Sequence, residues 1–209
     1  MTAVPLTRVG LDPLRTARHI ISSSWLALVV FGAVAGIFGI AGGRLADTFL
    51  GASYGSGIGA ELGRLVLLFS VWGIASIGVS VAFPLIFVVG LGRTLPWIAA
   101  AIVVVHIPAA FGAGRLAGLP GLVLSMAVTT AVVLVALLLE LGAFRTTMPG
   151  LLRAVLVVGG LAALAFVPPA LLLPDTAAAV TGALAYVALV GAIRPPGLRR
   201  AWLYLRDLR

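Results

Sequence analysis

Residues 93–142 read RTLPWIAAAIVVVHIPAAFGAGRLAGLPGLVLSMAVTTAVVLVALLLELG. The stretch begins with a basic turn that contains a proline and continues as an apolar run. It then passes through a glycine-rich connection at residues 112–121 and returns as a second apolar run. Each run approaches the roughly 20 residues that a helix needs to cross a bilayer. The stretch therefore predicts a membrane hairpin.

Composition indicates that lipid is the solvent for most of the chain. Of the 209 residues, 62% are hydrophobic and 10% are charged, and the mean hydropathy is +1.22. Soluble domains carry roughly 25% charged residues, and a soluble fold of this length cannot hide so much apolar surface. The chain has no cysteine, which excludes disulfide and thiolate chemistry, and its two histidines argue against a histidine-rich metal site. We expect no metal and no cofactor.

Six apolar runs follow one another along the chain, and we expect an all-α, polytopic membrane protein with a bundle of six transmembrane helices. Strand-length segments of alternating polarity, which a membrane β-barrel needs, are absent from the sequence. The first run is also longer than the core of a signal peptide. We expect an interfacial N-terminal segment at residues 1–19, a transmembrane domain at 20–193 and a basic tail at 194–209. The expected spans are residues 20–41, 65–91, 95–111, 122–141, 154–173 and 177–193.

The arginines predict the orientation. All fourteen basic residues are arginine, and the formal net charge is +8. With six spans, eleven arginines fall on one side and three on the other. Positive residues are retained in the cytoplasm, so both termini are expected on the cytoplasmic side of an inner (plasma) membrane. Placement in short loops and tails favours contact with anionic headgroups over nucleic-acid binding. The larger group is Arg8, Arg15, Arg18, Arg93, Arg145, Arg153, Arg194, Arg199, Arg200, Arg206 and Arg209, and the smaller is Arg44, Arg64 and Arg115.

Both polar ends of the chain predict short helices. Asp12-Pro13 is typical of a helix start, because aspartate caps helices and proline is tolerated at the first position. We expect a short interfacial helix there, leading into the first span. In the tail RPPGLRRAWLYLRDLR, Leu198, Trp202 and Leu205 can share one face while arginines occupy the rest. This pattern predicts a basic amphipathic helix in the headgroup zone, either as a solubilising tail or as a partner site.

Few polar side chains lie within the expected spans, so each is a candidate for function. His106 is the one titratable side chain deep in a span, where it is either functional or hydrogen-bonded to a neighbouring helix. Hydroxyl residues of the spans complete a candidate substrate cavity, and prolines supply candidate hinges. The cavity candidates are His106, Ser76, Ser80, Ser125 and Thr129, and the hinge candidates are Pro84, Pro96 and Pro108.

Small and charged residues at other positions predict packing and end contacts. Gly32 and Gly36 are spaced for close helix packing. Glu140 ends the fourth span within reach of Arg145, which predicts a peripheral ion pair. Alternatively, these two residues and Arg93 form a gate or contact lipid headgroups. No acidic pair lies within a span, and no HExxH or GxSxG motif occurs, so the chain is not expected to be an enzyme.

The hairpin resembles a known family. Its basic turn Arg93-Thr94-Leu95-Pro96, the segment GLPGLVL at residues 118–124 and the outer loop LADTFLGASYGSGIGAELGRL at residues 45–65 resemble the C-terminal lobe of multidrug/oligosaccharidyl-lipid/polysaccharide (MOP) superfamily flippases. Lipid II flippases and O-antigen or polysaccharide-repeat exporters are the branches that the chain resembles. Where that family often has asparagine after the proline turn, the nearest polar residue here is His106.

The resemblance implies a transporter module for undecaprenyl-linked saccharide, used in cell-envelope polysaccharide or peptidoglycan synthesis. Family members have two lobes, and the chain corresponds to one. Its expected partners are therefore the bilayer, the lipid-linked saccharide, and an N-terminal lobe or a second copy. The chain would be a fragment, a split half or a degenerate paralogue. The alternative is a non-transporting integral membrane protein that scaffolds or binds a cell-envelope complex.

Overall fold

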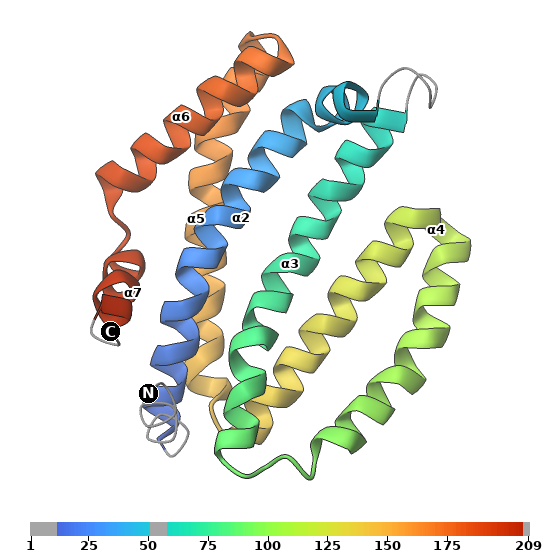
Figure 1. Cartoon of the computed structure of the whole chain (residues 1–209), viewed down its shortest axis with the longest axis vertical. Coiled ribbons are helices and arrows are strands. Elements are labelled where there is room, and N and C mark those ends of the chain that lie inside the picture. Colours follow the sequence, from blue (N-terminus) through green and yellow to red (C-terminus); the bar gives the residue numbers. More distant parts are fainter. Residues whose placement is uncertain (1–11, 51–57, 207–209) are drawn as a thin grey trace.

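The computed structural model describes residues 12–50 and 58–206, and within them every regular element is a helix. Figure 1 shows the helices as a bundle with one arm standing apart from it. The helices are α2 (Pro13–Leu50), α3 (Ile58–Val88), α4 (Leu95–Glu140), α5 (Phe144–Leu172), α6 (Asp175–Ile193) and α7 (Pro196–Arg206).

Five helices of the described part, α2 to α6, are long and apolar enough to cross a membrane. The difference from the six expected spans lies in α4. This helix is interrupted at Gly118, where the backbone leaves the helical region at φ 61° and ψ −144°. Figure 1 shows α4 folding back on itself there. We call residues 95–117 the first arm and residues 119–140 the second arm. They correspond to the expected third and fourth spans.

The start of α2 confirms the expected helix start at Asp12-Pro13. The Oδ1 atom of Asp12 accepts a hydrogen bond from the amide of Leu14 at 2.9 Å, which satisfies one of the first free N–H groups. From Pro13 the helix continues without a break into the apolar run. Residues 14–19 therefore form the first turns of the same helix as the first expected span.

The expected outer loop at residues 42–64 is shorter than predicted. Residues 42–50 extend α2, and residues 58–64 already belong to α3; residues 51–57 lie outside the described part. Gly42 and Gly63 hold the two helices together, because a Cβ at Gly63 would meet the backbone of Gly42 and Gly43 at 2.7–3.2 Å. Backbone contact of this kind requires glycine on both helices. Gly42 and Gly63 therefore serve helix packing within the expected loop.

The connections at the opposite end are short. After α3 passes through Pro84 it ends at Val88, and Gly90 adopts a positive φ of 79° in the turn that leads to α4. Between α4 and α5, Gly142 has a φ of 64°. Helix α5 then begins at Phe144, ten residues before the expected span at 154–173. The segment that contains Arg145 and Arg153 is therefore the first part of α5 and not a loop.

Helix α2 contacts most of the other helices, and its small residues make this possible. Gly32 lies against Tyr186 and Val158, and Gly36 lies against the ring of Phe166, so the GxxxG spacing does serve close packing against α5 and α6. The hydroxyl of Tyr186 donates to the carbonyl of Val29 at 3.0 Å. This bond satisfies the polar end of a large buried side chain, and it fixes α6 to α2.

The tail forms the expected helix and lies against α2. Ala201 is buried in a cluster with Trp25 and Leu28, and Leu198 packs at its edge. Trp202 is exposed, so it lies outside the packed face that it was expected to share with Leu198. Figure 1 places the start of α2 and the connections 89–94 and 141–143 at the lower end of the molecule, with α7 beside the lower half of α2.

Candidate functional site

The turn between the two arms of α4 depends on glycine. Gly118 has a positive φ of 61°, a backbone conformation that residues with a Cβ rarely adopt. At Gly121, a Cβ would overlap the carbonyl oxygen of Ala113 on the other arm. At Gly114, a Cβ would lie 3.3 Å from the side chain of Leu122. The glycine-rich connection therefore lets two apolar helices approach closely near their common turn.

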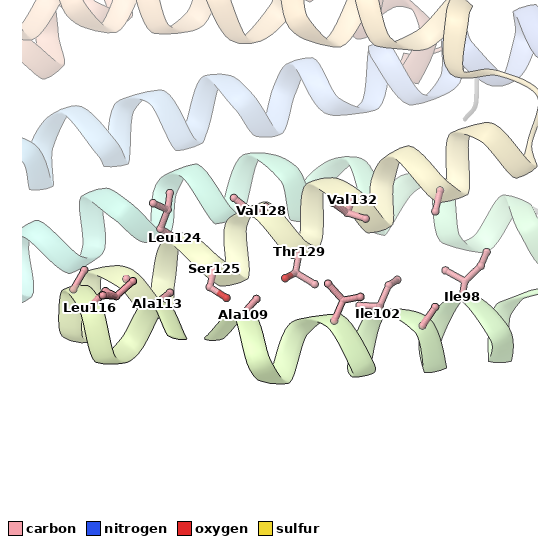
Figure 2. A pocket seen from close by; sticks show the side chains of 15 residues that line it. Ile98, Ile102, Ala109, Ala113, Leu116, Leu124, Ser125, Val128, Thr129 and Val132 are labelled. Carbon is pink, nitrogen blue, oxygen red and sulfur yellow. The ribbon is translucent and has the colours of Figure 1, made fainter. Parts of the chain in front are cut away.

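A groove of about 660 Å³ lies between the two arms. Figure 2 shows side chains from both arms along it, with the hydroxyl of Ser125 directed toward the first arm. Its lining is almost entirely aliphatic, with many alanines on the first arm and branched side chains on the second. The groove is lined by Ile98, Ala101, Ile102, Val105, Ala109, Ala113, Leu116, Ala117, Gly121, Leu124, Ser125, Val128, Thr129, Val132 and Ala136.

Two hydroxyl residues are the polar groups of this groove. Ser125 is 8% exposed, and its Oγ atom has no hydrogen-bond partner among the described residues. Thr129 lies one turn further along the second arm, and its Oγ1 atom is 2.8 Å from Nδ1 of His106 on the first arm. A hydrogen bond between helices satisfies two groups that lipid cannot. The groove thus combines an apolar wall with one free hydroxyl and one hydroxyl that is already paired.

The second arm is fixed to the bundle, whereas the first is fixed mainly to the second. The indole Nε1 of Trp72 on α3 donates to Oγ1 of Thr130 at 3.0 Å. Leu134, Leu137 and Leu138 of the second arm are buried in one cluster with α2, α3 and α5. On the first arm, the guanidinium of Arg115 lies 4.2 Å from the ring centre of Phe111, a contact within that arm.

The structure brings three of the five cavity candidates together. His106, Ser125 and Thr129 lie between the arms. Ser76 and Ser80 lie on α3 and do not line this groove. The five were predicted as one cavity because they share polarity within spans, but polarity does not show which helices face each other.

The gate and hinge candidates are separate from the groove. Arg93 is exposed in the turn before α4, and no ion pair joins Glu140 to Arg145 among the described side chains. Glu140 is the last residue of α4, whereas Arg145 lies in the first turn of α5, so the two side chains belong to different helices. Pro84 and Pro108 lie inside helices that continue past them, and Pro96 lies in the first turn of α4.

Sequence reasoning missed three features of this region. The Trp72–Thr130 bond joins residues 58 positions apart, although a tryptophan within a span must find a partner for its N–H. The spacing of Ala109, Ala113 and Ala117 at every fourth residue was a usable signal for a small-residue wall. At the other end, Arg44 forms an ion pair with Asp175 at 3.0 Å and joins α2 to α6.

The chain has no significant match among protein-family models, curated proteins or solved structures. The geometry of the described residues is therefore the basis for any assignment. Within those residues, no three His, Cys, Asp or Glu side chains gather where a metal ion could bind.

Proposed function

We propose that this chain is a transporter lobe that handles a lipid-linked substrate, as its resemblance to the C-terminal lobe of flippases implies. The observation that supports this most is the apolar groove between the arms of α4. A groove of about 660 Å³ is of the size of small-molecule sites. Its aliphatic lining suits a hydrocarbon chain, such as the isoprenoid of an undecaprenyl-linked saccharide, and not a sugar.

The proposed topology has six crossings. Each arm of α4 has more than the roughly 20 residues that span a hydrocarbon core, so the hairpin supplies two crossings. The positive-inside bias then places both termini in the cytoplasm of a cell with an inner (plasma) membrane. The connection at Gly118 would lie on the outer side.

A partner is part of this proposal. The described residues that line the groove include no charged side chain, so none of them offers a counter-ion for a lipid diphosphate. An N-terminal lobe or a second copy of the chain would supply the cationic half of the pathway. Alternating access would then occur between the two lobes.

The test is flipping in liposomes. The chain is reconstituted alone and with a candidate N-terminal partner, together with a fluorescent isoprenoid-diphosphate saccharide, and outer-leaflet fluorescence is bleached with dithionite. We expect a faster loss of inner-leaflet fluorescence with the partner present. Ala109→Trp, which fills the groove, should abolish this gain. Val104→Trp on the same arm is the control, because Val104 is exposed and does not line the groove.

The same lack of charge in the groove favours one alternative, a non-transporting protein that scaffolds or binds a cell-envelope complex. In that case, a folded protein would show no flipping with any partner. Ala109→Trp and Val104→Trp would then behave alike, and the transporter proposal would have to be abandoned.

A further inference from the structure

A second cleft, of about 570 Å³, is lined by residues of α2, α5 and α7 and by none of α4. Unlike the groove, it contains a charged side chain, that of Arg18. It is formed where the first turns of α5 and α7 meet the beginning of α2. Figure 1 shows α7 beside the lower half of α2, near the starts of α2 and α5. Arg18 and Ser22 come from α2, Thr146 from α5 and Gly197 from α7. Among the described residues, no acidic side chain lines the cleft.

Two polar side chains of this cleft, Arg18 and Ser22, are available to bind a ligand. Arg18 is exposed and forms no ion pair with any described residue, whereas its neighbour Arg15 pairs with Asp12 at 3.6 Å. Ser22 is 5% exposed and its hydroxyl makes no hydrogen bond within the described part of the chain. Because Ser22 lines the cleft, its hydroxyl is available to a ligand that has a hydrogen-bonding atom.

The helix ends favour an anion. Thr146 and Gly197 belong to the first turns of α5 and α7, where backbone N–H groups lack intrahelical partners. No side chain caps α5, and its N-cap residue is Ala143. The positive ends of two helix dipoles therefore add to the charge of Arg18.

The walls of the cleft are apolar. Leu14 and Leu203 are partly exposed at its rim, and Ile21 lies within it. A soluble anion would make no use of apolar walls. A phospholipid would, because its acyl chains lie next to its phosphate. The neighbouring Trp202 is exposed on α7, and tryptophan is enriched at the headgroup level of membrane proteins.

We propose that this cleft binds one anionic phospholipid, with its phosphate on Arg18 and the hydroxyl of Ser22 and with one acyl chain along Ile21 and Leu203. The bound lipid would join the ends of α2, α5 and α7 and keep the tail helix on the bundle. This site does not depend on whether the groove of α4 transports a substrate.

The test is lipid binding to the purified full chain, measured by native mass spectrometry as phosphatidylglycerol is titrated. Phosphatidylcholine with the same acyl chains is the headgroup control, and glycerol 3-phosphate is the control for a soluble phosphate. We expect phosphatidylglycerol to bind in preference to both. Arg18→Gln should weaken its binding about fivefold, the effect of roughly one basic residue near a membrane surface. Ser22→Ala should weaken binding by a smaller factor.

The matched control is Arg153→Gln, which removes the same charge from an exposed position of α5 that does not line the cleft. It should bind phosphatidylglycerol as the wild type does. Circular dichroism establishes that each variant is folded. The proposal is wrong if Arg18→Gln and Arg153→Gln lose affinity equally, if phosphatidylcholine binds as tightly, or if glycerol 3-phosphate alone accounts for the binding.

Discussion

The two arms of α4 have similar composition but different surroundings. In the second arm, Leu138 is 0% exposed and lies in a cluster with side chains of α2, α3 and α5. In the first arm, Leu116 is 91% exposed, and the described residues of this arm include none that is buried. One arm is thus a core helix of the bundle. The other contacts the second arm through a turn, a glycine contact and one side-chain hydrogen bond, and its first residue, Leu95, packs against the core cluster.

This difference shows what holds a helix in place when lipid is the solvent. Apolar area alone does not draw two helices together in a bilayer, because lipid tails are as apolar as leucine. Interdigitated side chains, small residues and polar pairs decide which helices meet. The first arm has few of these contacts outside the hairpin, and none of its described residues is buried.

The largest expected effect comes from a matched pair of leucines. Leu138→Ala should lower the free energy of unfolding by about 2 kcal/mol, because it leaves a cavity that the cluster does not fill. Leu116→Ala should change it by less than about 0.5 kcal/mol, because that side chain is 91% exposed and little of it packs against the protein. Both are measured by SDS-induced unfolding in detergent micelles. Equal effects would contradict the contrast between the arms.

Much of the fold could be predicted from the sequence, because hydropathy reports directly on the solvent of each segment. The long apolar runs, the hairpin and the start of α2 at Asp12-Pro13 were all visible. Helix ends were less accessible. Residues 42–50 and 144–153 are polar enough to resemble loops, yet they extend helices, because a helix that is already nucleated adds each further residue at little cost.

The candidate site was predicted only in part. His106 was singled out as a titratable side chain deep in a span, but its partner Thr129 is 23 residues away, and only the hairpin brings them together. Ser76 and Ser80 on α3 are hydroxyl residues four positions apart, as Ser125 and Thr129 are on α4, yet they do not line this groove. Hydropathy indicates which residues lie in the membrane. Which helix faces pack against each other depends on side-chain contacts between segments, and no single segment encodes them.

The turn provides the second prediction. Gly118→Ala should destabilise the protein by about 1.5 kcal/mol, because alanine must adopt a positive φ that glycine tolerates. Gly112→Ala is the control in the helical part of the first arm, where a Cβ meets no atom within 4 Å. It should be neutral or slightly stabilising, because alanine is the better helix former. Thermal unfolding in detergent measures both, and a Gly118→Ala protein as stable as the control would show that the turn does not need glycine.

The smallest expected effect separates the attachments of the two arms. A double-mutant cycle with His106→Ala and Thr129→Val should give a coupling of about 0.6 kcal/mol, typical of hydrogen bonds between membrane helices. Trp72→Phe with Thr130→Val is the matched cycle for the bond between α3 and the second arm. Because the chain has no cysteine, Gly114→Cys with Leu122→Cys reports separately on the hairpin through cross-linking. Loss of the His106 bond should slow this cross-linking, whereas loss of the Trp72 bond should leave it unchanged, because only the first bond joins the arms.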